Sequence, residues 1–179
     1  MKKWVVPVAF AALVALAVLV GSAAASPRAS YALLSSDLKL RPGVSHAGHP
    51  SANPPGLYGA FDATYYPRTG KLSYDLRWKG LAGSAFRAVI RSRATGAVYA
   101  VLCSPCRSTG RNGSREGLRV HGVEGTVVIS RDVAYLAVGA YTFVEVDTTA
   151  YPAGEIGGPA YGRFVYPGQP VVKSEPRCC

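Results

Sequence analysis

The stretch Tyr141-Thr-Phe-Val-Glu-Val-Asp-Thr-Thr-Ala-Tyr-Pro-Ala-Gly-Glu-Ile156 combines an alternating strand pattern, a turn with proline and glycine, and an immediate return to apolar sequence. Side chains alternate between the two faces of an extended strand. The odd-numbered residues from Tyr141 to Asp147 therefore share one face, and the even-numbered residues from Thr142 to Thr148 share the other. Because a turn at Tyr151–Gly154 then reverses the chain, the stretch indicates a β-sandwich module.

This segment resembles the C-terminal signature of the CHRD domain, which is repeated in chordin and occurs singly in many bacterial secreted proteins. The family strand reads roughly Tyr-x-Asn-Val-His-Thr and ends in Pro-x-Gly-Glu-Ile-Arg-Gly. The matching residues here are Tyr141, Val146, Thr148, Pro152, Gly154, Glu155, Ile156 and Gly158. The departures are Glu145 in place of Asn, Asp147 in place of His and Gly157 in place of Arg.

A second segment, Gly70-Lys-Leu-Ser-Tyr-Asp-Leu-Arg-Trp-Lys-Gly-Leu81, is similar to the family's Gly-x-Leu-x-Tyr-x-Leu strand and Gly-Leu corner. The resemblance covers residues 31–165 and implies an immunoglobulin-like or superoxide-dismutase-like β-barrel, without implying an enzyme. The His-Ile-His element that commonly follows the corner aligns with Val89-Ile90-Arg91, so we expect no inherited metal site. The alignment of Arg91 and Asp147 with imidazole positions also predicts that these two side chains are neighbours on adjacent strands.

The N-terminus has the layout of a secretory signal peptide over residues 1–25. Lys2 and Lys3 precede an apolar segment, Val8–Val20, which is followed by the small residues 21–25. Cleavage there predicts a secreted, periplasmic or cell-surface protein with no remaining membrane span. The competing interpretation is an uncleaved anchor, because Trp4–Ala25 is long enough to cross a bilayer core of about 30 Å.

The rest of the sequence is rich in short alternating segments separated by turn residues. Strands are expected at residues 31–40, 57–66, 72–79, 86–92, 97–102, 118–123, 126–129, 141–147 and 158–165. This pattern predicts an all-β fold, an antiparallel Greek-key sandwich or barrel in one domain at 31–165. One or two helical turns are expected at Ser130–Gly139, with Ser130 as the N-cap. The tail at 166–179 contains prolines and cysteines and is expected to lie outside the packed domain.

The pair of segments Leu57–Tyr66 and Leu72–Lys79 predicts a hairpin across Pro67–Gly70. The second segment alternates cleanly between apolar and polar residues. Its inward face is expected to carry Leu72, Tyr74, Leu76 and Trp78.

The chain is strongly basic, with a formal net charge of +10. Between Gly80 and Gly122 the only acid is Glu116, and the arginines are Arg87, Arg91, Arg93, Arg107, Arg111, Arg115 and Arg119. Such a field favours polyanionic partners such as acidic polysaccharide; another envelope protein is the second partner we consider. Nucleic acid is not expected, since an exported protein rarely meets it and no RNA-recognition pattern occurs. The alternative interpretation is that these arginines only solvate exposed strands and loops.

Cys103-Ser-Pro-Cys106 has the spacing of a dithiol redox motif, but a loop follows it rather than a helix that would activate the first thiol. In an oxidising compartment a structural disulfide is favoured. Cys178 and Cys179 are the other candidates, and four cysteines permit three complete pairings. A thiol-redox or metal-binding protein that uses Cys103 and Cys106 remains the alternative function.

Sequence motifs of catalysis are missing, including the nucleophile elbow, the His-Glu-x-x-His pair and phosphate-binding loops. The three histidines are His46, His49 and His121, and no carboxylate lies near the first two to complete a metal site. We therefore expect no enzyme, no cofactor and no metal, although an active site built from surface loops stays open. Glu145 and Asp147 share a strand face, where they would form a carboxylate pair or an ion pair with Arg91. The predicted function is an exported, non-enzymatic binding or structural module at the cell envelope.

Overall fold

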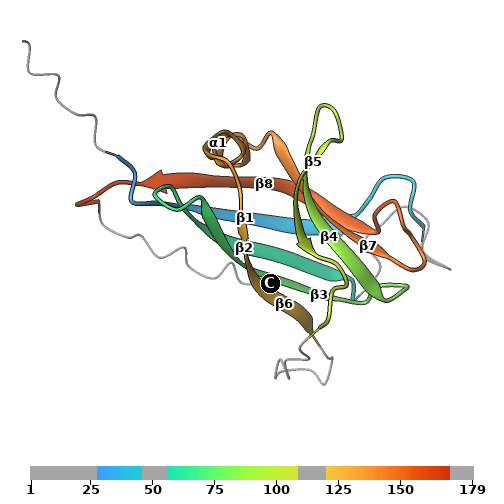
Figure 1. Cartoon of the computed structure of the whole chain (residues 1–179). Coiled ribbons are helices and arrows are strands. Elements are labelled where there is room, and N and C mark those ends of the chain that lie inside the picture. Colours follow the sequence, from blue (N-terminus) through green and yellow to red (C-terminus); the bar gives the residue numbers. More distant parts are fainter. Residues whose placement is uncertain (1–27, 46–55, 109–119, 170–179) are drawn as a thin grey trace, which may run out of the picture.

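The computed structural model describes residues 28–45, 56–108 and 120–169. This part of the chain forms an all-β fold with one short helix (Figure 1). The elements are β1 (Tyr31–Leu40), β2 (Tyr58–Tyr66), β3 (Lys71–Lys79), β4 (Ala85–Ser92), β5 (Val98–Cys103), β6 (His121–Val128), α1 (Arg131–Val138), β7 (Thr142–Thr148) and β8 (Ile156–Val165). All paired strands are antiparallel, in the order β5-β4-β7-β8-β1-β2-β3-β6.

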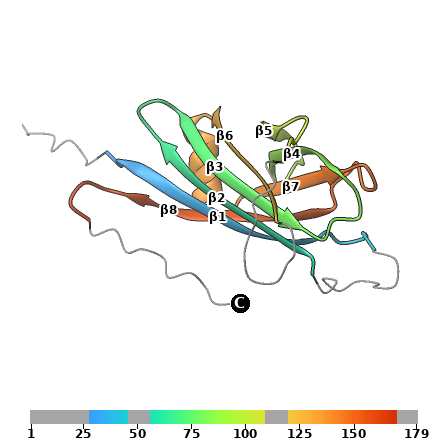
Figure 2. The ribbon, with the colours of Figure 1, turned by 90° about the horizontal axis from the view of Figure 1, so that it is seen from below.

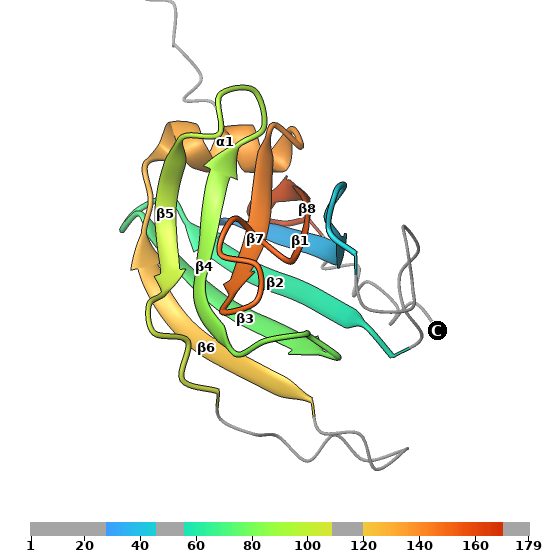
Figure 3. The ribbon, with the colours of Figure 1, turned by 90° about the vertical axis from the view of Figure 1, so that its right-hand side faces the viewer.

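The eight strands curl into a nearly closed barrel, in which the two end strands, β5 and β6, approach each other across the remaining seam. Figure 2 shows β1, β2, β3 and β8 side by side, and Figure 3 shows β4, β5 and β7 as a layer in front of β2, β3 and β6. The chain changes layer between β3 and β4. At the seam the Tyr74 hydroxyl donates a hydrogen bond to the carbonyl of Leu102, which links β3 to β5.

The predicted hairpin is confirmed, since β2 and β3 pair without interruption from Tyr58 and Lys79 to Tyr66 and Lys71. The four side chains expected on the inward face of β3 are each at most 6% exposed and belong to the core. Burying an apolar side chain of this size contributes roughly 1.5–3 kcal/mol. Strict alternation along β3 therefore directs this stabilisation to one face of the sheet.

The two short strands expected at 118–123 and 126–129 are instead one strand, β6, which pairs with β3 along its whole length. Gly125 lies between the two expected segments and inside β6. In the structure it lies opposite Tyr74, and a Cβ at this position would be 2.6 Å from the phenolic oxygen. The glycine therefore leaves room for a buried ring and does not end the strand.

The predicted helix is present as α1, whose N-cap is Ser130. The Ser130 hydroxyl accepts a hydrogen bond from the amide of Val133 at 3.2 Å, and Gly139 ends the helix. Ala134 and Ala137 are buried, and α1 contacts β8, β1 and β7. None of the helices in the described ranges has the length and apolar character needed to cross a membrane.

Candidate functional site

Two acidic side chains of β7, Glu145 and Asp147, are completely buried although they point away from the barrel core. Their neighbours Val144 and Val146 fill the core on the other face. β7 lies between β4 and β8, so strands flank it on both sides. A buried carboxylate is strongly unfavourable unless it is paired or hydrogen-bonded, and this predicts partners on the outer face.

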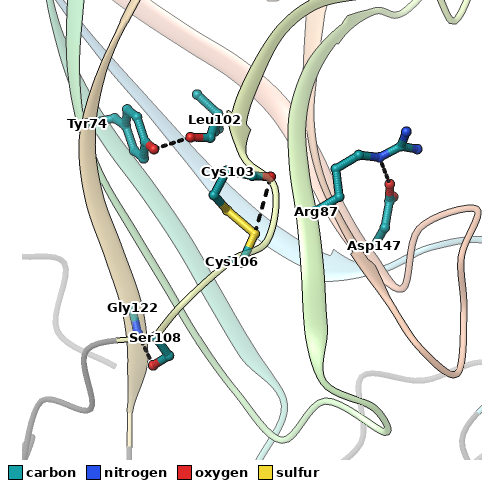
Figure 4. The surroundings of a disulfide bond; sticks show 8 residues. All are labelled: Tyr74, Arg87, Leu102, Cys103, Cys106, Ser108, Gly122 and Asp147. Carbon is teal, nitrogen blue, oxygen red and sulfur yellow. Dashed lines mark hydrogen bonds and ion pairs between the residues drawn. A yellow bond between two sulfur atoms is a disulfide. The ribbon is translucent and has the colours of Figure 1, made fainter.

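Three arginines supply those partners. Arg91 on β4 places Nη2 2.5 Å from Oε1 of Glu145, and Arg41, which follows β1, contacts Oε2 of the same carboxylate. Arg87 on β4 places Nε 2.5 Å from Oδ2 of Asp147 (Figure 4). We call these five residues the arginine–carboxylate cluster.

The ion pair expected between Arg91 and the carboxylates of β7 is present, but Arg91 forms it with Glu145, and the expected proximity of Arg91 to Asp147 is corrected because Asp147 pairs with Arg87. The two strands are adjacent, as expected, but Arg87 stands directly opposite Asp147 and Arg91 stands opposite Phe143. Arg91 therefore reaches Glu145 along the diagonal, while Asp147 pairs with Arg87. Residue alternation along a strand indicates which side chains share a face, whereas the register between strands decides which side chains pair.

The turn after β7 folds back onto the cluster. Gly154 has φ +103°, and its amide donates to the carbonyl of Tyr151 at 3.1 Å, which confirms the predicted turn. A Cβ on Gly154 would lie 2.6 Å from Cδ of Glu145. Arg41 also donates through Nη1 to the carbonyl of Ala153. This turn therefore helps to bury Glu145 and needs glycine for both its backbone conformation and the close contact.

Glu155 has a structural role. It is completely buried, and its Oε1 accepts a hydrogen bond from the amide of Ala82 at 2.7 Å. Its Oε2 accepts from the hydroxyl of Thr148 at 2.6 Å. Glu155 thus joins the β3–β4 connection to the end of β7. Among the other residues of the matched motif, Ile156 lies in the core, whereas Tyr141 and Pro152 are exposed.

The environment of Glu145 shifts its protonation. Burial is the largest cause and raises the pKa of Glu145, Arg41 and Arg91 lower it, and the neighbouring Asp147 raises it again. The net direction is upward, so the folded protein holds a proton on this side chain more readily than the unfolded chain does.

The other described arginines of the predicted basic surface, Arg93 and Arg107, are not members of the cluster. Arg93 is exposed after β4 and donates through Nη1 to the carbonyl of Ala140 at 2.9 Å. Arg107 is exposed in the segment that follows the cysteine pair. The other three candidates, Arg111, Arg115 and Arg119, fall outside the described residues. Carboxylates thus neutralise two of the described candidates, Arg87 and Arg91, and leave part of each side chain accessible.

Cys103 and Cys106 form a disulfide, in agreement with the structural interpretation (Figure 4). The amide of Cys106 donates to the carbonyl of Phe86 at 3.2 Å, and Ser104 to Ser108 form bends and irregular structure rather than a helix. The hydroxyl of Ser108 accepts from the amide of Gly122 at 3.2 Å, which ties this segment to β6. Cys178 and Cys179 lie outside the described residues.

His121 is exposed on β6, with Nδ1 3.2 Å from the hydroxyl of Ser108. The other two histidines, His46 and His49, fall outside the described ranges. Within those ranges, no three His, Cys, Asp or Glu side chains are grouped in a way that would hold a metal ion.

Sequence reasoning missed Arg41, which directly follows the first expected strand at 31–40. Its partner Glu145 is distant in the chain and meets it only because β1 and β7 both neighbour β8. What the cluster can do chemically is hold guanidinium groups in fixed positions, each with N–H donors left over for a ligand. Comparison of the chain with protein-family models, curated proteins and solved structures finds no match.

Proposed function

We propose that this protein is an exported, non-enzymatic, CHRD-like module that binds or scaffolds other components at the cell envelope. In this proposal its barrel is a Greek-key arrangement of the immunoglobulin-like or superoxide-dismutase-like kind. The resemblance of the Pro-x-Gly-Glu-Ile segment and the signal-peptide layout of the N-terminus support it. The structural roles of Gly154 and Glu155 are further support, because they give physical reasons for these residue types at these positions.

The proposed contact is with polyanions, through the surface that carries Arg87, Arg91, Arg93 and Arg107. One observation supports the proposed contact with polyanions. Arg87 and Arg91 are each held by a completely buried carboxylate, yet their side chains remain 38% and 23% exposed. A guanidinium that is already fixed loses less conformational freedom when a ligand binds, which favours affinity. Acidic polysaccharide is the proposed ligand, and an acidic envelope protein is the alternative partner.

The test is titration of the protein with polygalacturonate at several salt concentrations. Replacing the two exposed residues together, Arg93→Gln with Arg107→Gln, is expected to weaken binding about fivefold to tenfold, because two charged contacts are lost. The matched control is Arg68→Gln with Lys71→Gln, which removes the same charge from exposed positions around the β2–β3 turn. Binding that ignores salt, or that falls equally in the control, would refute the polyanion contact.

The thiol-redox alternative has weaker support. A reactive cysteine needs an environment that lowers its thiol pKa, such as a helix N-terminus, and Cys103 is followed by bends. We therefore propose a structural role for the disulfide. Mass spectrometry of the purified protein separates the two, since free reactive thiols or a retained metal would favour the alternative.

A further inference from the structure

An open groove with a volume of about 1230 Å³, lined by both polar and apolar groups, runs along the outer face of β8, β1, β2, β3 and β6. Figure 2 shows four of these strands side by side. The groove does not include β4 or β7, which carry four of the five residues of the arginine–carboxylate cluster. It is therefore a second surface, and its chemistry is independent of the polyanion contact proposed above.

A row of carboxylates crosses this groove. Asp62 on β2 stands directly opposite Asp75 on β3, which in turn stands directly opposite Glu124 on β6. Ser35 and Tyr161 continue the same row onto β1 and β8. Like charges directly opposite each other destabilise a sheet. An in-register row of three acids is therefore a disadvantage for folding and attracts positive charge.

Arg77 supplies part of that charge. Its Nη2 lies 2.5 Å from Oδ2 of Asp62, and its Nε lies 3.4 Å from Oδ2 of Asp75. One guanidinium shared by two carboxylates leaves a negative excess. The lining of the whole groove contains four carboxylates and two guanidiniums, namely Asp37, Asp62, Asp75 and Glu124 with Arg77 and Arg163. The groove is thus locally acidic in a chain whose net charge is +10.

The rest of the lining suits a ligand rich in hydroxyl groups. The hydroxyls of Ser73 and Thr126 lie 3.3 Å apart across β3 and β6, and both donate and accept hydrogen bonds. Tyr58 and Tyr161 line the same groove and provide aromatic surface next to polar groups. Aromatic rings pack well against the apolar face of a sugar ring, while carboxylates and hydroxyls bond to its hydroxyl groups.

We propose that this groove binds a glycan chain whose sugars carry free amino groups. The ammonium groups pair with Asp62 and Asp75, and the sugar hydroxyls bond to the polar side chains around them. Charge complementarity selects this class over an acidic polymer, which the carboxylate row repels. The open groove accommodates an extended chain better than a compact small molecule.

The experiment compares two oligomers of equal length, one of glucosamine and one of N-acetylglucosamine, by isothermal titration calorimetry with the full chain. The amine oligomer is expected to bind, and the acetylated oligomer at least about tenfold more weakly, because acetylation removes the charge. The strongly basic chain repels a polycation at long range. Binding of the amine oligomer therefore requires a local acidic surface.

A matched pair of variants assigns that binding to the groove. Asp75→Asn is expected to weaken binding of the amine oligomer about fivefold, because one ion pair is lost. Asp132→Asn removes the same charge from an exposed position on α1, outside the groove, and is expected to have no effect. Circular dichroism checks that both variants keep the fold.

No binding of the amine oligomer, equal binding of both oligomers, or equal losses in the two variants would each overturn the proposal. The Arg93 and Arg107 substitutions are expected to leave binding of the amine oligomer unchanged. Asp75→Asn is likewise expected to leave polygalacturonate binding unaffected. Failure of either proposal is therefore distinguishable from failure of the other.

Discussion

The outer faces of two parts of the barrel carry the same kind of ion pair in opposite surroundings. Arg87 meets Asp147 at 2.5 Å on β4 and β7, and Arg77 meets Asp62 at 2.5 Å on β3 and β2. The side chain of Asp147 is completely buried, whereas that of Asp62 is 57% exposed. The two ion pairs therefore have the same length but contribute differently to stability.

The difference comes from what lies around each carboxylate. The turn with Gly154 packs against Glu145, the neighbour of Asp147 in the cluster, whereas the carboxylates of β2 and β3 line an open groove. Removing one partner of a buried ion pair costs about 3–5 kcal/mol, since the other charge stays buried without compensation. An exposed pair contributes about 0–1 kcal/mol. The cluster is thus part of the packing of β7, whereas the ion pair of Arg77 and Asp62 in the groove stays in contact with solvent.

The largest expected effect is that of Gly154→Ala. An alanine there must adopt a positive φ and its Cβ would press on Glu145 and Arg41, so the free energy of unfolding should fall by about 2–4 kcal/mol. Gly43→Ala is the matched control, because Gly43 has φ +83° but has no atom within 4 Å of the added Cβ. It should lose only about 1 kcal/mol. If urea denaturation gave equal losses in the free energy of unfolding for the two variants, the turn would not press on the cluster.

The next effect is that of Arg87→Gln, which leaves Asp147 buried without its guanidinium partner. We expect a loss of about 2–3 kcal/mol in the free energy of unfolding. This lies below the value for a fully buried pair, because the Arg87 side chain is itself 38% exposed. Urea denaturation measures the loss, and a change under about 0.5 kcal/mol would remove the distinction between the two faces.

A smaller effect is expected in the pH dependence of stability. The pKa of Glu145 is raised in the folded state, so the folded protein binds this proton more tightly than the unfolded chain. The contribution of Glu145 is fully present below the ordinary glutamate pKa of 4.5 and is lost as pH rises through the raised folded value.

Glu145→Gln removes that contribution. The difference in urea midpoint between the parent protein and the variant, followed from acid to neutral pH, should therefore shift against the parent as pH rises. A difference in urea midpoint that stays constant across this pH range would mean that the pKa of Glu145 is not raised. The combined effect of Arg41, Arg91 and Asp147 on that pKa would then cancel the effect of burial.

The smallest effect is that of Asp62→Asn, the exposed counterpart of the Arg87 substitution. Its pair with Arg77 is solvated, and loss of the charge also relieves repulsion from Asp75. Stability should change by no more than about 0.5 kcal/mol in either direction. A loss comparable to that of Arg87→Gln in the same urea assay would mean that the groove charges are structural.

Several elements could be predicted because residues only a few positions apart in the sequence determine them. Leu72, Tyr74, Leu76 and Trp78 alternate with polar residues, and the hydrophobic effect turns them inward. Ser130 and Gly139 bound α1 through contacts within a few residues. The continuity of β6 through Gly125 was not predicted, since the role of this glycine depends on Tyr74 of another strand.

The candidate site was predicted only in part. The shared face of Glu145 and Asp147 followed from strand alternation, and the adjacency of their strand to Arg91 followed from the family resemblance. The pairing partners did not follow, because they depend on the register between β4 and β7. Arg41 and the acidic row across β2, β3 and β6 were not recognised, since each joins residues that are far apart in the sequence.

The sequence by itself determined the all-β class, the hairpin of β2 and β3 and the capped helix. These depend on periodicity, turn residues and spacing, which act between near neighbours. Only the tertiary structure decided which charges became buried and which remained in water. That outcome depends on strand register and on the chain segments that pack over each face, so identical residue types became structural in β7 and accessible in the groove.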